Sequence, residues 1–157
     1  MKFLLILLFA APAFAQPTVT YDKFRDVTSV SGESARVSSL HMVPTCLHKG
    51  EKLTAAADLH CYLIFRSASR SWEFLKSRDL IFLVDGERVD LGKGTHEGDV
   101  SSSRYRVGVT ERMMFKIPRA ELEKITAASS VEFKLGYVEG KLDPKDLKGI
   151  KDVLAYK

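Results

Sequence analysis

The sequence contains no asparagine, one tryptophan, two cysteines and five prolines among its 157 residues. The absence of asparagine excludes N-linked glycosylation, and it leaves glycine and aspartate to form the tight turns. Neither sign of charge dominates, because 24 lysines and arginines stand against 20 aspartates and glutamates and give a net charge of +4. Since this excess is small and the sequence contains no recognised nucleic-acid-binding motif, we expect no nucleic-acid partner.

The only long apolar run lies at the N-terminus, in residues 1–15. Lys2 precedes this run, which ends in Ala-Phe-Ala, the pattern of a secretory signal peptide cleaved before Gln16. The run is too short to cross a bilayer in the mature protein. We therefore expect a cleaved signal peptide at 1–15 and a single exported β-rich domain at 16–157, soluble in the periplasm or secreted. Because no cysteine follows the cleavage position, a lipoprotein is not expected.

The two cysteines, Cys46 and Cys61, are even in number and have a spacing suited to a hairpin, which favours a disulfide in an oxidising compartment. Such a bond is expected to stabilise the fold by about 3 kcal/mol. The neighbouring His48 and His60 suggest a zinc site as the alternative. If Cys46 faces Cys61 across antiparallel strands, however, His60 points to the opposite face. The pattern therefore favours the disulfide, with no metal and no cofactor.

Short apolar segments separated by Gly, Ser and Asp dominate the sequence beyond Gln16, which is typical of a mainly β protein. No regular alternation of strands and helices is present, so a parallel nucleotide-binding sheet is not expected. We expect a β-sandwich or open barrel, mostly antiparallel, with a short helix near 119–128 and a C-terminal helix near 144–156. The expected strands are 18–30, 35–43 (ended by Pro44), 59–67 (central in its sheet), 79–84 and 87–91 (a hairpin through Asp85-Gly86), 105–117 and 131–135.

Prolines mark the starts of both expected helices. Pro118 suits the first turn of the first helix, and Pro144 suits the first position of the second, with Asp143 as its N-cap. Leu122 and Ile125 lie on one side of the first helix, and we expect the C-terminal helix to pack its apolar face on the sheet.

Glu111 interrupts the clearest alternating pattern in the sequence. In 105–117 the odd positions are otherwise apolar, while the even positions carry mostly arginine, lysine and threonine. One interpretation is a bulge or turn near Gly108 that shifts the phase of the strand. The other is a partly buried functional carboxylate. The pattern favours the bulge.

Two stretches contain the candidate functional residues. The polar, glycine-rich segment 92–103 holds His96, Glu97 and Asp99, which could bind a cation or share acid-base chemistry, but the pattern favours an exposed loop. The segment 66–78 surrounds the only tryptophan with basic residues, which can bind an anionic partner through forked hydrogen bonds and stacking. Alternatively, the large apolar side chains of that segment pack on the core while its basic groups remain in water. The candidate residues of the second stretch are Arg66, Arg70, Trp72 and Arg78.

Several stretches of the sequence resemble a loosely defined group of uncharacterised exported bacterial domains. The matching pieces are YDKFRDVT at 21–28, SWEFL at 71–75, LVDG at 83–86 and VEFKLG at 131–136. The resemblance covers most of the chain after residue 15 and implies an exported β-rich domain with a C-terminal helix. The function of this group is unknown, so the resemblance implies no catalytic residue.

The function expected from these observations is a non-enzymatic exported domain that binds a partner or associates with the cell envelope. The partner is expected to be an anionic envelope component or another exported protein. The alternative is a small secreted hydrolase or metal-dependent enzyme that uses His96, Glu97 and Asp99, together with Glu111.

Overall fold

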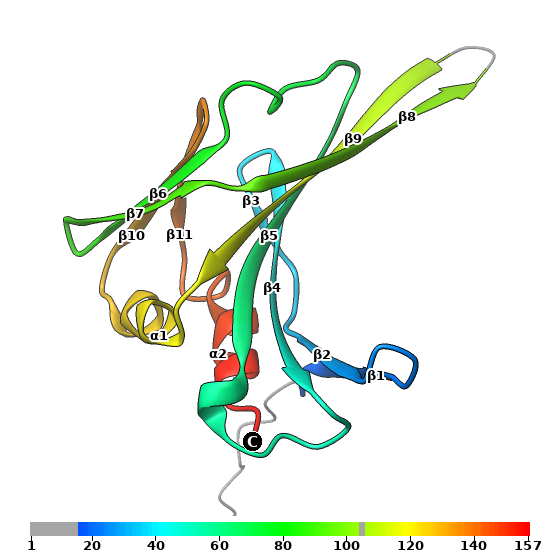
Figure 1. Cartoon of the computed structure of the whole chain (residues 1–157). Helices are drawn as coiled ribbons and strands as arrows, with labels where there is room; N and C mark the ends of the chain where they lie inside the picture. The colour runs from blue at the N-terminus through cyan, green and yellow to red at the C-terminus, as the bar shows by residue number, and fades with distance from the viewer. Residues whose placement is uncertain (1–15, 104–105) are drawn as a thin grey trace, which may run out of the picture.

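A computed structural model describes residues 16–103 and 106–157, so the expected signal peptide at 1–15 and Tyr105 lie outside the described residues. The described chain forms two antiparallel sheets and two helices, with no closed barrel among these elements. Figure 1 shows the two sheets as the layers of a sandwich, with both helices below the smaller sheet. The expected fold class, mainly β and mostly antiparallel with two helices, is confirmed.

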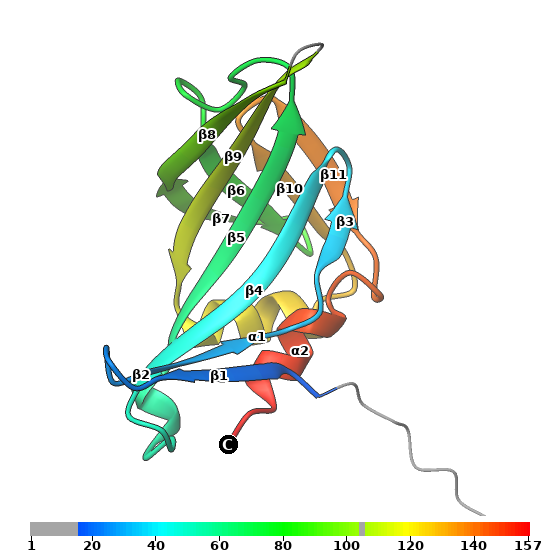
Figure 2. The same ribbon diagram turned by 90° about the vertical axis from the view of Figure 1, so that its right-hand side faces the viewer.

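The larger sheet contains seven strands in the order β1-β2-β4-β5-β9-β8, and β3 pairs with β4 beyond the end of β2. β5 lies between β4 and β9, as expected for the apolar segment 59–67. Figure 2 shows this sheet from the side that faces away from the smaller sheet. Its strands are β1 (Thr18–Asp22), β2 (Val27–Ser31), β3 (Ala35–Val37), β4 (Leu40–Lys49), β5 (His60–Ser69), β8 (Thr95–Ser103) and β9 (Arg106–Ile117).

The smaller sheet contains four strands in the order β11-β10-β6-β7. Its strands are β6 (Asp79–Val84), β7 (Glu87–Lys93), β10 (Val131–Leu135) and β11 (Val138–Leu142). Asp85 and Gly86 join β6 to β7 with φ angles of 49° and 86°, the positive values that a tight hairpin turn of this type requires, so the expected hairpin is confirmed. The sequence did not predict β11, which follows a turn at Gly136.

The core lies between the two sheets and continues under the helices. Phe65 on β5 stacks on Phe133 of the smaller sheet at 5.9 Å and meets Phe115 edge-on at 6.0 Å. All three rings are at most 3% exposed. Apolar contacts across the layers therefore join the sheets, which is how a sandwich buries its alternating inner residues.

The two helices, α1 (Arg119–Ala127) and α2 (Lys148–Leu154), cover the part of the larger sheet that extends beyond the smaller one (Figure 1). Leu122 and Ile125, the apolar residues on one side of α1, are fully buried. Pro118 is the N-cap of α1 rather than its first helical residue. No helix in the described part of the chain is both long enough and apolar enough to cross a membrane.

The C-terminal helix begins later than expected, at Lys148 instead of residue 144. The Asp146 carboxylate accepts the Asp143 N–H at 2.9 Å, and the Asp146 N–H donates to the Asp143 carbonyl at 2.9 Å. These bonds close a turn over residues 143–147. The expected N-cap residue therefore starts this turn, and the helix follows it.

Pro44 does not end a strand, contrary to the sequence-based expectation. β4 continues through it to Lys49, and Pro44 pairs with Leu63 of β5. The Pro44 carbonyl accepts the Gly32 N–H at 3.0 Å, so the backbone polar groups of Pro44 face away from β5. This position lies where the neighbour of β4 changes from β3 to β2. The missing N–H of proline therefore breaks no bond of the β4–β5 ladder.

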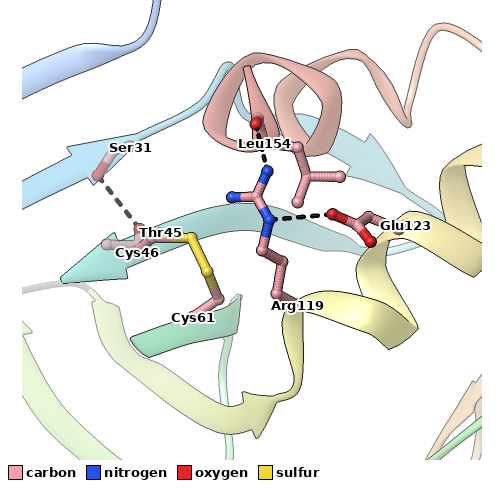
Figure 3. Close-up of a disulfide and its surroundings, with 7 residues drawn as sticks. All are labelled: Ser31, Thr45, Cys46, Cys61, Arg119, Glu123 and Leu154. Carbon is pink, nitrogen blue, oxygen red and sulfur yellow. Dashed lines mark hydrogen bonds and ion pairs between the residues drawn. A yellow bond between two sulfur atoms is a disulfide. The ribbon is translucent and has the colours of Figure 1, made fainter. Parts of the chain in front are cut away.

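A disulfide joins Cys46 of β4 to Cys61 of β5, as expected, and the two residues are direct cross-strand partners (Figure 3). Cys46 is 0% exposed and Cys61 is 2% exposed. Arg119 lies close by in the same view, and it donates to the Glu123 carboxylate at 3.0 Å and to the Leu154 carbonyl at 2.7 Å. The disulfide and this arginine thus lie together where both helices meet the larger sheet.

Replacing Gly149 in α2 with alanine is expected to destabilise the protein by about 2 kcal/mol. Alanine normally stabilises a helix interior by about 1 kcal/mol relative to glycine. Here, however, a Cβ on Gly149 would lie 2.0 Å from the Glu33 carbonyl oxygen, and backbone atoms cannot move away as a side-chain tip can. Urea unfolding of this variant measures the loss. The exposed Lys151→Ala change in the same helix is the control, and equal stability of the two variants would contradict the packing argument.

Candidate functional site

The outer face of the larger sheet carries a row of basic side chains that lie in register across four strands. Arg36 on β3 pairs with His41 on β4, His41 pairs with Arg66 on β5, and Arg66 pairs with Arg112 on β9. Directly paired residues of an antiparallel sheet point to the same face. With strands about 4.8 Å apart, the row crosses about 14 Å of the sheet. We call these four residues the basic row.

The basic row faces outward because its neighbours along each strand face the core. Leu40 and Met42 flank His41 and are 0% exposed, whereas His41 itself is exposed. Arg36 and Arg66 are likewise exposed, and Arg112 is half-buried. Glu97 on β8 ends the row, where its carboxylate pairs with the Arg112 guanidinium at 3.4 Å. Among the described residues, this is the only ion pair that joins the basic row to an acid.

Apolar and polar side chains continue the outer face beside the basic row. The next residues along the strands are Val43, Ile64 and Met114, which are cross-strand partners. Thr45, Tyr62 and Lys116 follow in the same way. Beyond them, a hollow of about 710 Å³ is lined by residues that include Arg25, Leu47, Lys49, His60 and Tyr62. The outer face therefore combines cations with apolar surface along its length.

The outer face of the smaller sheet has a different arrangement of charge. Arg88 pairs with Asp90 at 2.7 Å, and Lys134 pairs with Glu139. Glu132 likewise lies opposite Lys141. Opposite charges alternate there, as expected for a sheet face in water. The row of basic side chains without alternating acids on the larger sheet is therefore not a general property of this fold.

Glu111 is a fully buried carboxylate on the inner face of β9. β9 keeps an unbroken register with both β5 and β8 around it, so the expected bulge near Gly108 is wrong. The Glu111 carboxylate accepts the backbone N–H of Glu73 at 2.7 Å, that of Phe74 at 2.9 Å, and His96 Nε2 at 2.9 Å. These partners account for the carboxyl group at an apolar position, and they tie the segment after β5 to the sheet.

The pKa of Glu111 is lowered. Burial by itself would raise that pKa, but the hydrogen bonds from the Glu73 and Phe74 N–H groups and from His96 outweigh the effect of burial. Glu111 is therefore ionised at neutral pH. A carboxylate held by backbone donors in this way serves to fix the 70–78 segment on the sheet.

The segment expected to form a loop, 92–103, is mostly the edge strand β8, so the loop prediction is wrong. Because strand residues alternate between faces, His96 points inward to Glu111, while Glu97 points outward to Arg112. Asp99 lies on the outer side with Glu97 and accepts the Val100 N–H at 2.8 Å. The three residues therefore do not converge. In residues 16–103 and 106–157, no group of three or more His, Cys, Asp or Glu side chains is arranged to hold a metal ion.

The candidate residues of the segment 66–78 lie in different environments. Trp72 is 39% exposed and lies over His96, with ring centres 5.9 Å apart. Arg78 donates to the carbonyls of Gly94 and Leu75, so it holds the segment in place. Arg70 is exposed beyond the end of β5, and Arg66 belongs to the basic row. The structure thus brings Trp72 to His96 and places Arg66 and Glu97 on either side of Arg112, but it does not gather all seven candidates into one site.

Three members of the basic row, Arg36, His41 and Arg112, were not among the candidate residues expected from the sequence. Each is more exposed than its two neighbours along the strand, which is the ordinary pattern of an outward-facing strand position. That pattern marks them as outward-facing, but only the pairing of β3, β4, β5 and β9 places them in one row with Arg66.

Comparison of the chain with models of protein families, with curated proteins and with solved structures finds no match.

Proposed function

We propose that this protein is a binding domain that takes an extended anionic polymer on the outer face of its larger sheet. The observation that carries the proposal is the basic row, in which Arg36, His41, Arg66 and Arg112 are consecutive cross-strand partners. Guanidinium groups suit the carboxylate, sulfate or phosphate groups of such a polymer because they donate forked hydrogen bonds.

Stability does not account for the basic row. Arg66 and Arg112 lie directly opposite each other, and like charges in that position are destabilising by up to about 1 kcal/mol. The smaller sheet avoids this cost with Arg88–Asp90 and Lys134–Glu139 pairs. A partner that brings negative charge to the larger sheet would remove the repulsion, which makes a polyanion the fitting ligand.

The shape of the molecule favours a chain over a flat partner. In Figure 1 the β1–β2 hairpin and the β8–β9 hairpin both project to the side that the outer face occupies, one near each end. A flat surface would meet these hairpins before it reached the basic row. A polymer strand can lie across β3, β4, β5 and β9 between them.

The proposed function agrees with the expectation of a non-enzymatic domain with an anionic partner. The proposed contact surface, however, differs from the one expected from the sequence. Only Arg66 and Glu97 of the seven expected surface residues lie in or beside the basic row. The enzyme alternative needs His96, Glu97 and Asp99 in one place, and β8 puts His96 on the opposite face from the other two.

The proposal is tested by binding of dextran sulfate, with uncharged dextran as the reference polymer. Arg66→Gln is expected to weaken binding of dextran sulfate about tenfold at low salt, since a charged hydrogen bond contributes about 1.5–3 kcal/mol. Binding should also weaken steeply as salt rises, because contact with a polyanion releases its counterions. Titration calorimetry measures both effects.

Arg88→Gln is the matched control, because it removes the same charge from the outer face of the smaller sheet. It should change the affinity less than twofold. Equal losses in the two variants would show that only net charge matters, and failure to bind dextran sulfate at all would contradict the proposal.

A further inference from the structure

We propose that the tip of the β1–β2 hairpin, residues 22–26, contacts the surface of an anionic lipid bilayer and places the ring of Phe24 among the lipid headgroups. This inference is independent of the polymer proposal, because it rests on different residues. The tip falls within the YDKFRDVT stretch, whose residues the basic row does not use.

The tip is a rigid turn built by its own side chains. The Asp22 carboxylate accepts the N–H of Phe24 at 2.9 Å and that of Arg25 at 3.2 Å. The Tyr21 hydroxyl donates to the Asp26 carboxylate at 2.9 Å, and the Asp26 carbonyl accepts the Gly50 N–H at 2.9 Å. The tyrosine and both aspartates of the stretch therefore hold the backbone. Lys23, Phe24 and Arg25 are exposed at the tip, and Arg25 Nε also lies 3.8 Å from the Asp22 carboxylate.

Phe24 is far more exposed than any other large apolar side chain in the described part of the chain. It is 90% exposed, while the next are Tyr137 at 59%, Leu75 at 50% and Val100 at 47%. Partly exposed apolar residues are common on protein surfaces. A whole aromatic ring that a turn of fixed geometry holds away from the protein is uncommon. Such a ring points to a partner that covers it.

The chemistry on either side of Phe24 suits an anionic lipid surface. Lys23 Nζ lies 5.1 Å from the centre of the Phe24 ring, and the Arg25 side chain is 84% exposed. Aromatic rings enter the boundary between lipid headgroups and acyl chains, and neighbouring cations pair with lipid phosphates. The tip also projects from the molecule in Figure 1, so it can reach a flat surface that the basic row cannot.

The proposal is tested by co-sedimentation of the protein with vesicles of equal parts phosphatidylglycerol and phosphatidylcholine. Phe24→Ala is expected to lower the partition coefficient about tenfold, as loss of a buried ring implies. Because the ring is exposed in the free protein, the variant should unfold at the same urea concentration as the parent. Val100→Ala removes an exposed apolar side chain from the other projecting hairpin, and it should leave binding unchanged.

The charged part of the contact is measured separately. The Lys23→Gln/Arg25→Gln double variant should bind anionic vesicles less well and should match the parent on pure phosphatidylcholine. Absence of vesicle binding, or equal binding by Phe24→Ala and the parent, would overturn the proposal. Loss of vesicle binding in Arg66→Gln with full binding by Phe24→Ala would also overturn it, since the basic row would then be the lipid contact.

Discussion

Replacing Glu111 with alanine is expected to lower the free energy of unfolding by about 4 kcal/mol, the cost of leaving several donors to a buried carboxylate without a partner. The carboxylate is 0% exposed, and it accepts two backbone N–H groups and His96 Nε2. Alanine leaves all three donors without their acceptor, and the Phe74 N–H among them is buried while the other two are partly buried. Urea unfolding followed by far-UV circular dichroism measures the loss.

The fluorescence of Trp72 shows which part of the structure loses its contacts in this variant. As the only tryptophan, it lies over His96 on the segment that Glu111 holds. In Glu111→Ala we expect its emission to shift to longer wavelength at urea concentrations below the main transition, because residues 72–74 detach first. A variant as stable as the parent, or one with unchanged emission, would show that the carboxylate does not hold this segment.

Glutamine at position 111 separates charge from hydrogen bonding. Glu111→Gln retains one accepting oxygen, so it should cost about 2 kcal/mol at pH 7. The lowered pKa of Glu111 means that its stabilising effect is present above the pKa of the unfolded chain, near 4.5, and is lost as pH falls through the lower folded-state value. The parent should therefore lose its advantage over Glu111→Gln in acid. A constant difference between the two across this pH range would contradict the assignment.

Removal of the disulfide in a Cys46→Ala/Cys61→Ala variant is expected to lower the free energy of unfolding by about 3 kcal/mol. The bond joins two residues separated by 15 positions, so without it the unfolded chain regains the freedom of that loop. Serine at both positions should cost more than alanine, since it buries two hydroxyl groups among apolar neighbours. Urea midpoints of the two double variants and the parent test this order.

The burial of the disulfide gives a second measurement. Since Cys46 and Cys61 are at most 2% exposed, a reductant should leave the bond intact in the folded parent protein and cleave it once urea unfolds the chain. Intact mass after alkylation counts the thiols in each case. Rapid reduction without urea would contradict a sulfur pair enclosed in the core.

Local patterns predicted those parts of the fold that depend on neighbouring residues. Asp85-Gly86 between two apolar runs predicted the β6–β7 hairpin, and the even cysteine count predicted the disulfide. The predicted strand end at Pro44 was wrong. A proline interrupts a strand only if its missing N–H would face a neighbouring strand, and the side that it faces depends on the strand order. The start of α2 was missed because the Asp143–Asp146 turn uses hydrogen bonds that compete with helix capping.

The candidate site depended on contacts between distant residues, and the sequence predicted less of it. Segment 92–103 has the composition of a loop, yet pairing with β9 makes most of it a strand. Glu111 interrupted a row of apolar residues in the sequence. It can nevertheless lie on the inner face of β9, because its carboxylate accepts hydrogen bonds from N–H groups 37 and 38 positions away. The basic row needs residues from four strands, so no local window contains it.

The Glu111 contact has a consequence for how related sequences should vary. Two of its three donors are backbone groups, so residues 73 and 74 contribute through N–H groups that every amino acid except proline possesses. We expect evolution to accept many side chains at position 73 while excluding proline there. Positions 96 and 111 should change together, since the histidine side chain is the one partner that can be lost by substitution. An alignment of homologues would then show covariation between positions 96 and 111 on neighbouring strands. Position 73 would vary, although its backbone N–H would still bind the carboxylate.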